Sequence, residues 1–326
     1  MADRKFPLGA LDVLEQGLVA FDPILLDKLL KDKTTGTNIR WGTNDYQKYG
    51  EPFGADKEIK ASLVTGVYAN VIQPRISKSE AERTRRTRNK AEVFTPSWLC
   101  NQQNNLIDHA WFGRKDVFNI EAERSWEPIL DQIVFPEDKT WQDYVKDTRL
   151  EIACGEAPYL ASRYDTVTGE ILPISHRVGL LDRKLRIVDE NTQSETEWLT
   201  WAVIAMQNIY GFDYQGDNVL LARENLLYTF ADYYIDRFEK DPDVKLLRTI
   251  ANIISWNIWQ MDGITMTVPY FEKPKETTHQ MSWSVELKVD ESELQVNKTE
   301  SARLLPCRIM DWPAKKSITY KSLIKG

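Results

Sequence analysis

Between about residue 145 and residue 264 the chain alternates short apolar segments with longer segments of helical period. The strand-like segments are TRLEIA at 148–153, IYGFD at 209–213 and NIWQMDG at 257–263. Segments with apolar residues at helical spacing lie at 197–208, 216–238 and 243–256. Because the strands are separated by helices, this pattern predicts an α/β fold with a parallel sheet and crossover connections.

The residues before this region predict mainly helices and turns. Residues 8–31 have helical period interrupted at Asp22-Pro23, where a second helix begins. Residues 34–76 are polar and rich in turn-forming residues. We expect a charged helix with a serine cap over 77–90 and another over 97–111, with Ser97 as its cap.

After residue 264 the pattern changes to period two. TMTVPYFE at 265–272 and HQMSWSVELKVD at 279–290 predict antiparallel strands around a polar turn, and the chain closes with a basic segment. We therefore divide the chain into a helical region at 1–112, an α/β core at 113–264 with an insertion at about 166–195, and a β-hairpin with a basic segment at 265–326.

Composition limits the classes of function. The net charge of −7 gives no general attraction for nucleic acid, so any such contact needs a local basic patch or another chain. The three cysteines and three histidines are scattered, which argues against a zinc site or a disulfide framework. With no apolar run of about 18 residues and no secretory signal, we expect a cytoplasmic protein without a membrane contact.

The residues just after each predicted strand carry the chemistry. In open parallel sheets ligands bind at the carboxyl ends of the strands. Here those positions hold the turn 151–157 with its single Gly155, then Asp213, then Asp262. A glycine turn permits close backbone approach, and two carboxylates can accept from ribose hydroxyls and from an exocyclic amine. The pattern indicates a nucleoside site.

Four segments in this order resemble the S-adenosylmethionine-dependent DNA methyltransferases of restriction-modification systems, in the adenine-N6 group. They are AEVFTPSWLCNQQNNLID at 91–108, EIACGEAPYL at 151–160, IYGFDYQGDNVLLARENLL at 209–227 and NIWQMDGI at 257–264. The resemblance implies a Rossmann-like methyltransferase sheet, partial because the strands of the catalytic motif are missing, and S-adenosyl-L-methionine (SAM) as cofactor.

The resemblance also implies a role for each matching residue. Those expected near the methionine end of SAM are Phe94, Thr95 and Pro96, and those expected to line the turn are Glu151, Cys154 and Gly155. Asp213 is expected on the ribose and Asp262 on the adenine amine. The chain departs from the family where Ala157 replaces a second glycine, because a positive φ is costly there and cofactor binding would be weaker.

The family's catalytic motif, an Asn, Asp or Ser before Pro-Pro and an aromatic residue, has no counterpart here. None of the fourteen prolines adjoins another, and TVPY at 267–270 is only a poor substitute. We therefore expect no catalytic residue in this chain and a split enzyme, in which a second subunit supplies the Pro-Pro motif and target recognition and double-stranded DNA binds to the complex.

Two alternatives stay open. One is a non-catalytic assembly or binding subunit that kept the fold and lost SAM affinity; the other is a methyltransferase for a small molecule. A basic stretch at 75–90 could contact DNA phosphates, although a solvated helix face is a slightly better explanation of it. Its candidate residues are Arg83, Arg85, Arg86, Arg88 and Lys90.

Overall fold

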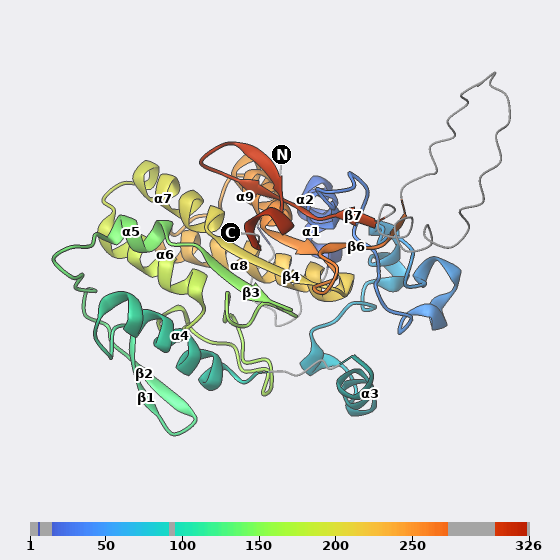
Figure 1. Cartoon of the computed structure of the whole chain (residues 1–326). Helices are drawn as coiled ribbons and strands as arrows, with labels where there is room; N and C mark the ends of the chain where they lie inside the picture. Colours follow the sequence, from blue (N-terminus) through green and yellow to red (C-terminus); the bar gives the residue numbers. More distant parts are fainter. Residues whose placement is uncertain (1–5, 7–14, 91–94, 273–303, 325–326) are drawn as a thin grey trace, which may run out of the picture.

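The computed structural model describes residues 6, 15–90, 95–272 and 304–324 of the chain. These residues form a mixed α/β fold in which helices pack against a small parallel sheet (Figure 1). The predicted α/β class is confirmed at this level. The strand predicted over 279–290 lies outside the described residues.

The parallel sheet has the strand order β3–β4–β5. Its strands are β3 (Arg149–Ile152), β4 (Ile209–Asp213) and β5 (Ile258–Gln260). Both neighbouring pairs are parallel, with Glu151 opposite Gly211 and Gly211 opposite Ile258. The carboxyl ends of all three strands therefore lie at one edge of the sheet, as the sequence predicts.

Helices cover one face of this sheet. α6 (Leu180–Asn191) and α7 (Glu195–Gln207) come between β3 and β4, and α8 (Gly216–Phe238) and α9 (Val244–Asn257) come between β4 and β5. α8 is buried along most of its length and contacts β4 and β5. α6 lies in the stretch that we expect to be an insertion, yet it packs against α7 and α8 and belongs to the core.

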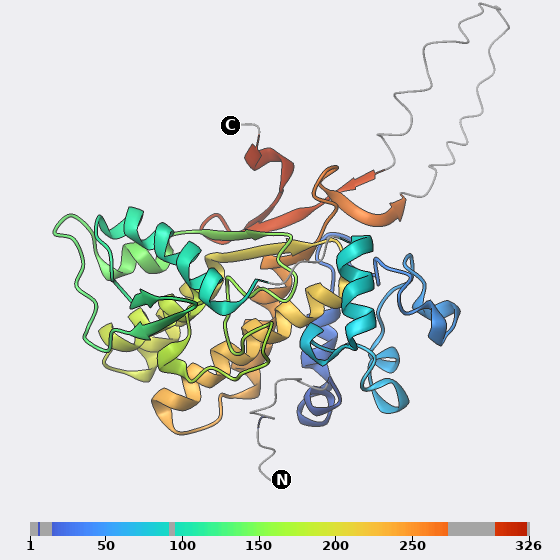
Figure 2. The ribbon, with the colours of Figure 1, turned by 90° about the horizontal axis from the view of Figure 1, so that it is seen from below.

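The C-terminal strands cover part of the opposite face of the sheet (Figure 2). These elements are β6 (Thr267–Glu272), β7 (Leu304–Pro306), β8 (Arg308–Asp311), β9 (Lys316–Thr319) and the short α11 (Lys321–Ile324). Phe212 of β4 and Trp259 of β5 pack with Ile309 and Tyr320 in a second apolar cluster. In the described part of the chain, Leu150 and Ile152 of β3 stay largely exposed beside this cover.

The N-terminal helices pack on the end of the α/β region. α1 (Glu15–Phe21) contacts α2 (Pro23–Leu30), and α2 lies against α9. Asp22 caps α2 and Pro23 occupies its first turn, as predicted. Arg248 of α9 donates to the two carboxylate oxygens of Asp22 at 2.7 and 2.9 Å, which ties the two helices together.

Two further helices precede the sheet. α3 (Glu80–Lys90) and α4 (Ser97–Phe112) confirm the two helices predicted there. Ser79 caps α3, because its Oγ accepts the N–H of Glu82 at 3.3 Å. The cap predicted for α4 is wrong: the N–H of Ser97 itself donates to the carboxylate of Asp165, at 2.7 Å. A side chain distant in sequence thus caps this helix.

The sequence pattern gives no indication of a β-hairpin that follows α4. Its strands are β1 (Asn119–Ala122) and β2 (Ser125–Pro128), joined by a tight turn. Arg124 occupies this turn at φ 54°, a conformation for which glycine or asparagine is favoured. Because the turn residue is atypical and the strands are largely exposed, nothing in the composition marks them. Between β2 and β3 lies the short helix α5 (Trp141–Lys146).

Candidate functional site

The turn after β3 contains two of the predicted cofactor residues, Cys154 and Gly155. Three alternate residues of this turn have positive φ, namely Ala153 at 50°, Gly155 at 53° and Ala157 at 62°. Ala157 therefore adopts a backbone conformation for which glycine is better suited, at a cost of roughly 1–2 kcal/mol for an alanine.

The turn after β3 is bonded to the end of β4. The N–H of Gly155 donates to Oδ2 of Asp213 at 2.9 Å. Oδ1 of Asp213 accepts from the N–H of Gln215 at 2.9 Å and from the Asn218 amide at 3.4 Å. Burial raises the pKa of Asp213 to about 6, although these N–H donors favour its charged form. The turn after β3 and the carboxyl end of β4 thus meet in one hydrogen-bonded unit.

The side chains of Glu151 and Cys154, which are also predicted to line the turn, lie beside this unit. Burial raises the pKa of Glu151 well above its ordinary range, against the N–H groups of Tyr159 and Leu160, and the nearby charge of Asp213 adds to the rise. Cys154 is buried, and burial together with Glu151 and Asp213 raises the pKa of its thiol. Both side chains therefore favour their neutral forms and support the turn from inside.

Asp262 follows β5, and β5 is the neighbour of β4 in the sheet. Its Oδ1 accepts the N–H groups of Ile264 and Thr265 at 2.9 and 3.0 Å, which fixes the turn between β5 and β6. The neighbouring Met261 donates its N–H to the carbonyl of Asp213 at 2.9 Å. The strand ends that carry Asp213 and Asp262 are thus adjacent, while one oxygen of Asp262 already has a structural use.

A residue that sequence reasoning missed, Gln260, joins the N-terminal region to this edge of the sheet. Its side chain accepts the N–H of Arg40 at 2.8 Å and donates to the carbonyls of Arg40 and Tyr214 at 2.9 and 2.8 Å. Gly216 leaves room for this segment, because a Cβ there would lie 1.9 Å from the Arg40 carbonyl oxygen. The segment around Arg40 therefore covers the ends of β4 and β5.

The residues predicted to lie near the methionine end of SAM are close to the turn after β3. The side chain of Thr95 lies beside that of Tyr159, and the backbone of Tyr159 lies beside Glu151. The Thr95 carbonyl accepts from the hydroxyl of Thr166 at 3.0 Å. Pro96 precedes α4 and lines a separate cavity. The third residue of this motif, Phe94, lies outside the described residues.

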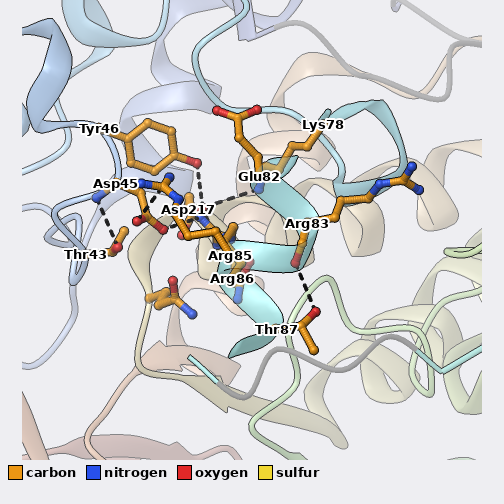
Figure 3. Close-up of polar contacts among 12 residues, drawn as sticks. Thr43, Asp45, Tyr46, Lys78, Glu82, Arg83, Arg85, Arg86, Thr87 and Asp217 are labelled. Atoms are coloured by element: carbon orange, nitrogen blue, oxygen red, sulfur yellow. Dashed lines mark hydrogen bonds and ion pairs between the residues drawn. The ribbon is translucent and has the colours of Figure 1, made fainter. Parts of the chain in front are cut away.

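The basic helix α3 is anchored at the N-terminus of α8 (Figure 3). Arg86 is 2% exposed, and its guanidinium lies 2.8 Å from the carboxylate of Asp217, which also accepts from the Tyr46 hydroxyl at 2.6 Å. Lys78 is buried beside them, with its Nζ 3.6 Å from the same carboxylate. Arg86 thus holds α3 in place and is not on the surface where a phosphate would bind.

The remaining arginines of α3 differ in their surroundings. Arg85 forms an ion pair with Asp45 at 3.2 Å. Arg83 extends away from this cluster in Figure 3, and together with Arg88 it lines an open cavity. The side chain of Lys90 lies outside the described part of the chain. Among the predicted phosphate contacts whose side chains the structure describes, Arg83 and Arg88 keep open surroundings suited to a phosphate.

The weak catalytic candidate TVPY lies in β6. Tyr270 is 49% exposed and has φ 55°, and its ring packs edge-on against Tyr214 with 6.2 Å between centroids. A bulky residue at positive φ is uncommon in proteins. Burial and Tyr270 raise the pKa of Tyr214. The segment supplies an aromatic pair near Asp262 but no amide acceptor.

Comparison of the chain with protein-family models, with curated proteins and with solved structures gives no match. Within the described residues, histidines, cysteines and carboxylates do not gather into groups that could hold a metal ion. In the same part of the chain, no helix is both long and apolar enough to cross a membrane.

Proposed function

We propose that this chain is the SAM-binding subunit of a split DNA adenine-N6 methyltransferase of a restriction-modification or phage-defence system. A second polypeptide carries the catalytic Pro-Pro motif and the target-recognition region, and double-stranded DNA binds to the complex. The observation that carries the proposal is the direct bond between the glycine turn after β3 and Asp213 after β4.

This bond supports the proposal because it unites residues that the resemblance assigns to one cofactor. Gly155, Asp213 and Asp262 follow three adjacent parallel strands, at the edge where open α/β sheets bind ligands. The two carboxylates also fit the adenosyl part of SAM, since they can accept hydrogen bonds from ribose hydroxyls and from an exocyclic amine. The pattern is the one expected for a nucleoside held between strand ends.

The free edge of β3 supports a partner subunit. Among the described residues β3 pairs only with β4, and Leu150 and Ile152 on its uncovered face are 40% and 68% exposed. An unpaired edge with apolar side chains favours pairing with another chain. A cavity of about 360 Å³ next to this face is lined mainly by apolar residues, Leu150 and Trp259 among them. These features suit a strand supplied by a second polypeptide.

The residues of this chain would bind and orient, and the partner would hold the target adenine. When bound, SAM would supply an activated methyl group for direct transfer to the adenine amine, with S-adenosylhomocysteine as the leaving group and loss of one amine proton. Glu151 and Cys154 keep the turn dry and in shape, while Asp213 and Asp262 hold the nucleoside end. Positioning two reactants in a site that excludes water accounts for such a displacement without a covalent nucleophile.

A second candidate function is an assembly subunit that has lost SAM affinity. The observations that favour it are the position of the Arg40 segment over the ends of β4 and β5 and the burial of Asp213, which is 7% exposed. A ribose would reach Asp213 only after local opening. An assembly subunit of this kind would still dock its partner at the free edge of β3 but would not bind SAM.

Titration calorimetry separates the two functions. The chain alone, and then the chain with the product of a neighbouring gene that encodes an Asn-Pro-Pro-Tyr motif, is titrated with SAM. The variants are Asp213→Asn and Asp262→Asn, because asparagine keeps one acceptor oxygen for the local turn and removes the charge. Asp131→Asn, an exposed position away from the sheet edge, is the matched control.

We expect one-to-one binding that each site variant weakens about tenfold and that the control leaves unchanged. The weakening corresponds to about 1.4 kcal/mol, as for one hydrogen bond to a charged group. If SAM binds neither the chain alone nor the chain with its partner, the SAM-binding function is rejected and the assembly function is left.

A further inference from the structure

We propose that a groove beside α3 binds an unpaired strand of nucleic acid, with phosphates on arginines of α3 and bases against two tryptophans. We call it the α3 groove; it consists of two adjoining cavities of about 660 and 430 Å³. The proposal goes beyond the proposed function, in which double-stranded DNA binds to the complex. It rests on that function only for nucleic acid as the class of partner, and strand binding needs neither SAM nor a second subunit.

The larger cavity has the side chains of a phosphate site. Its lining includes Arg75, Arg83, Arg88, Thr84, Thr87 and Thr166. Guanidinium groups and hydroxyls donate hydrogen bonds to phosphate oxygens, and those from arginine are charge-assisted. Glu80 is the one acidic residue among the residues that line this cavity. A chain with a net charge of −7 thus concentrates positive charge here.

The arginines of this cavity are partly preorganised. The guanidinium of Arg75 donates to the hydroxyl of Thr87 at 2.6 Å, which holds it against α3. The Nε of Arg83 is buried and has no hydrogen-bond partner among the described residues. An unpaired buried N–H costs about 1–3 kcal/mol, so a small shift of the Arg83 side chain that brings this Nε to a phosphate oxygen would be favourable.

The smaller cavity has aromatic walls. It is lined by Trp98 from the first turn of α4 and by Trp126 from β2. The indole N–H of Trp126 donates to the carbonyl of His176 at 3.0 Å, which fixes the orientation of its ring. Aromatic side chains stack on unpaired bases with little regard to sequence, at roughly 1–3 kcal/mol per base.

One loop joins the two cavities. Val167 lines both of them, with Thr166 on the phosphate side and Thr168 on the aromatic side. The carboxylate of Asp165 fixes this loop by accepting the N–H groups of Val167 and Thr168 at 2.9 and 2.7 Å. Its other oxygen caps α4 through Ser97, so the loop and the helix that carries Trp98 are held together.

The arrangement favours a single strand over a duplex or a free nucleotide. Stacking needs an open base face, and in a duplex both faces are covered by neighbouring bases. Each cavity alone has the size of a small-molecule site, so the two in succession hold more than one nucleotide. A positive channel beside aromatic walls is also the general design of single-strand binding surfaces.

Fluorescence anisotropy with the full chain tests the proposal. Three labelled probes of equal length are used. They are a single strand of oligodeoxythymidylate of about a dozen nucleotides, a DNA duplex, and an abasic single strand. Arg83→Gln/Arg88→Gln removes two phosphate contacts. Lys60→Gln/Lys245→Gln removes two exposed charges elsewhere and is the matched control. Trp126→Leu removes one stacking surface, and urea melts verify that each variant folds.

We expect the arginine double variant to lose about tenfold or more in affinity for both single strands, and its salt dependence to fall by about 1.4 in the logarithmic slope. Trp126→Leu should weaken binding of the thymidylate about fivefold or more and leave the abasic strand unchanged. Equal losses in the lysine control, tighter binding of the duplex, or no strand binding at low salt would overturn the proposal.

A competition arm distinguishes a strand from a free nucleotide. Thymidine triphosphate should displace the labelled strand only at much higher concentration than unlabelled oligodeoxythymidylate does. Displacement at equal or lower concentration would assign the groove to a small nucleotide and overturn the strand. Because no SAM is present, failure here is independent of the calorimetric test of cofactor binding.

Discussion

The N–H of Gly155 and the Oδ2 of Asp213 are 2.9 Å apart, although the residues are separated by 58 positions in the chain. The bond joins the carboxyl ends of β3 and β4, which are neighbours in the parallel sheet. Any ligand that uses this oxygen of Asp213 shares it with the glycine turn. Protonation of the carboxylate, the shape of the turn and ligand binding are therefore linked.

The first prediction concerns pH. Burial raises the pKa of Asp213 to about 6 in the folded state, against a reference of 3.8, so the folded protein binds the proton more tightly. The stabilising contribution is complete below the unfolded pKa and is lost as pH rises through about 6. Relative to Asp213→Asn, the wild type should therefore gain about 1 kcal/mol of unfolding free energy between pH 7 and pH 5.

Urea unfolding of both proteins at the two pH values measures this gain. The asparagine variant serves as the reference, because carboxylates distant from Asp213 titrate equally in both proteins. A difference that stays constant with pH, or that moves in the opposite direction, would show that Asp213 titrates as an ordinary carboxylate.

The second prediction concerns the backbone of the turn. Gly155 has φ 53°, and a Cβ at this position would meet no heavy atom within 4 Å, so Gly155→Ala adds strain without a clash. We expect a loss of about 1 kcal/mol of stability in urea unfolding. The exposed Ala153 at φ 50° gives the opposite test, since Ala153→Gly should be neutral or stabilising. A stabilising Gly155→Ala would contradict the assigned conformation.

The third prediction concerns the buried pair of Arg86 and Asp217. Arg86→Leu leaves a fully buried carboxylate with less compensation, and we expect a loss of about 3 kcal/mol or more. Arg86→Leu/Asp217→Leu should recover much of it, because the uncompensated charge is removed as well. A double-mutant cycle by urea unfolding gives the coupling energy. Arg85→Gln breaks the half-exposed ion pair with Asp45, and we expect it to cost less than about 0.5 kcal/mol of stability.

The fourth prediction concerns Gln260. Gln260→Ala removes three hydrogen bonds to Arg40 and Tyr214, which at about 1 kcal/mol each amounts to roughly 3 kcal/mol. Trypsin should then cut faster after Arg40 and Lys57, because the segment that contains them is released. Gln193→Ala, at an exposed site, is the control. Unchanged cleavage would mean that other contacts hold this segment.

The fifth prediction concerns the free edge of the sheet. Ile152→Lys should leave stability within about 0.5 kcal/mol, because the side chain is already 68% exposed. If β3 docks the partner subunit, the same change should abolish co-purification of the two chains. Ile264→Lys, at a 92% exposed position after β5, should leave the complex intact. Equal recovery of both variants would place the partner elsewhere.

Much of the fold follows from the sequence, because local periodicity determines which segments bury apolar faces. β4 begins and ends where IYGFD does, and α8 occupies the whole predicted segment 216–238. Asp22-Pro23 marks the start of α2 for a local reason, a side-chain cap followed by a fixed φ. These features need no knowledge of the rest of the chain.

What the sequence did not predict depends on partners distant along the chain. Asp165 caps α4 from 68 residues away, and Gln260 holds Arg40 from 220 residues away. Arg86 looks like its neighbours on a basic helix, yet only the fold places Asp217 against it. The residues at the strand ends were found from order and spacing, whereas the cover over them requires three-dimensional structure.

The contact between Arg40 and Gln260 has a consequence during protein synthesis. A ribosome that adds roughly 5–20 residues per second needs on the order of 10–45 seconds to make the 220 residues between them. Throughout that time the Arg40 segment lacks its final hydrogen-bond partners. The amino-terminal part of each nascent chain is thus open to chaperones and proteases for longer than the part made last.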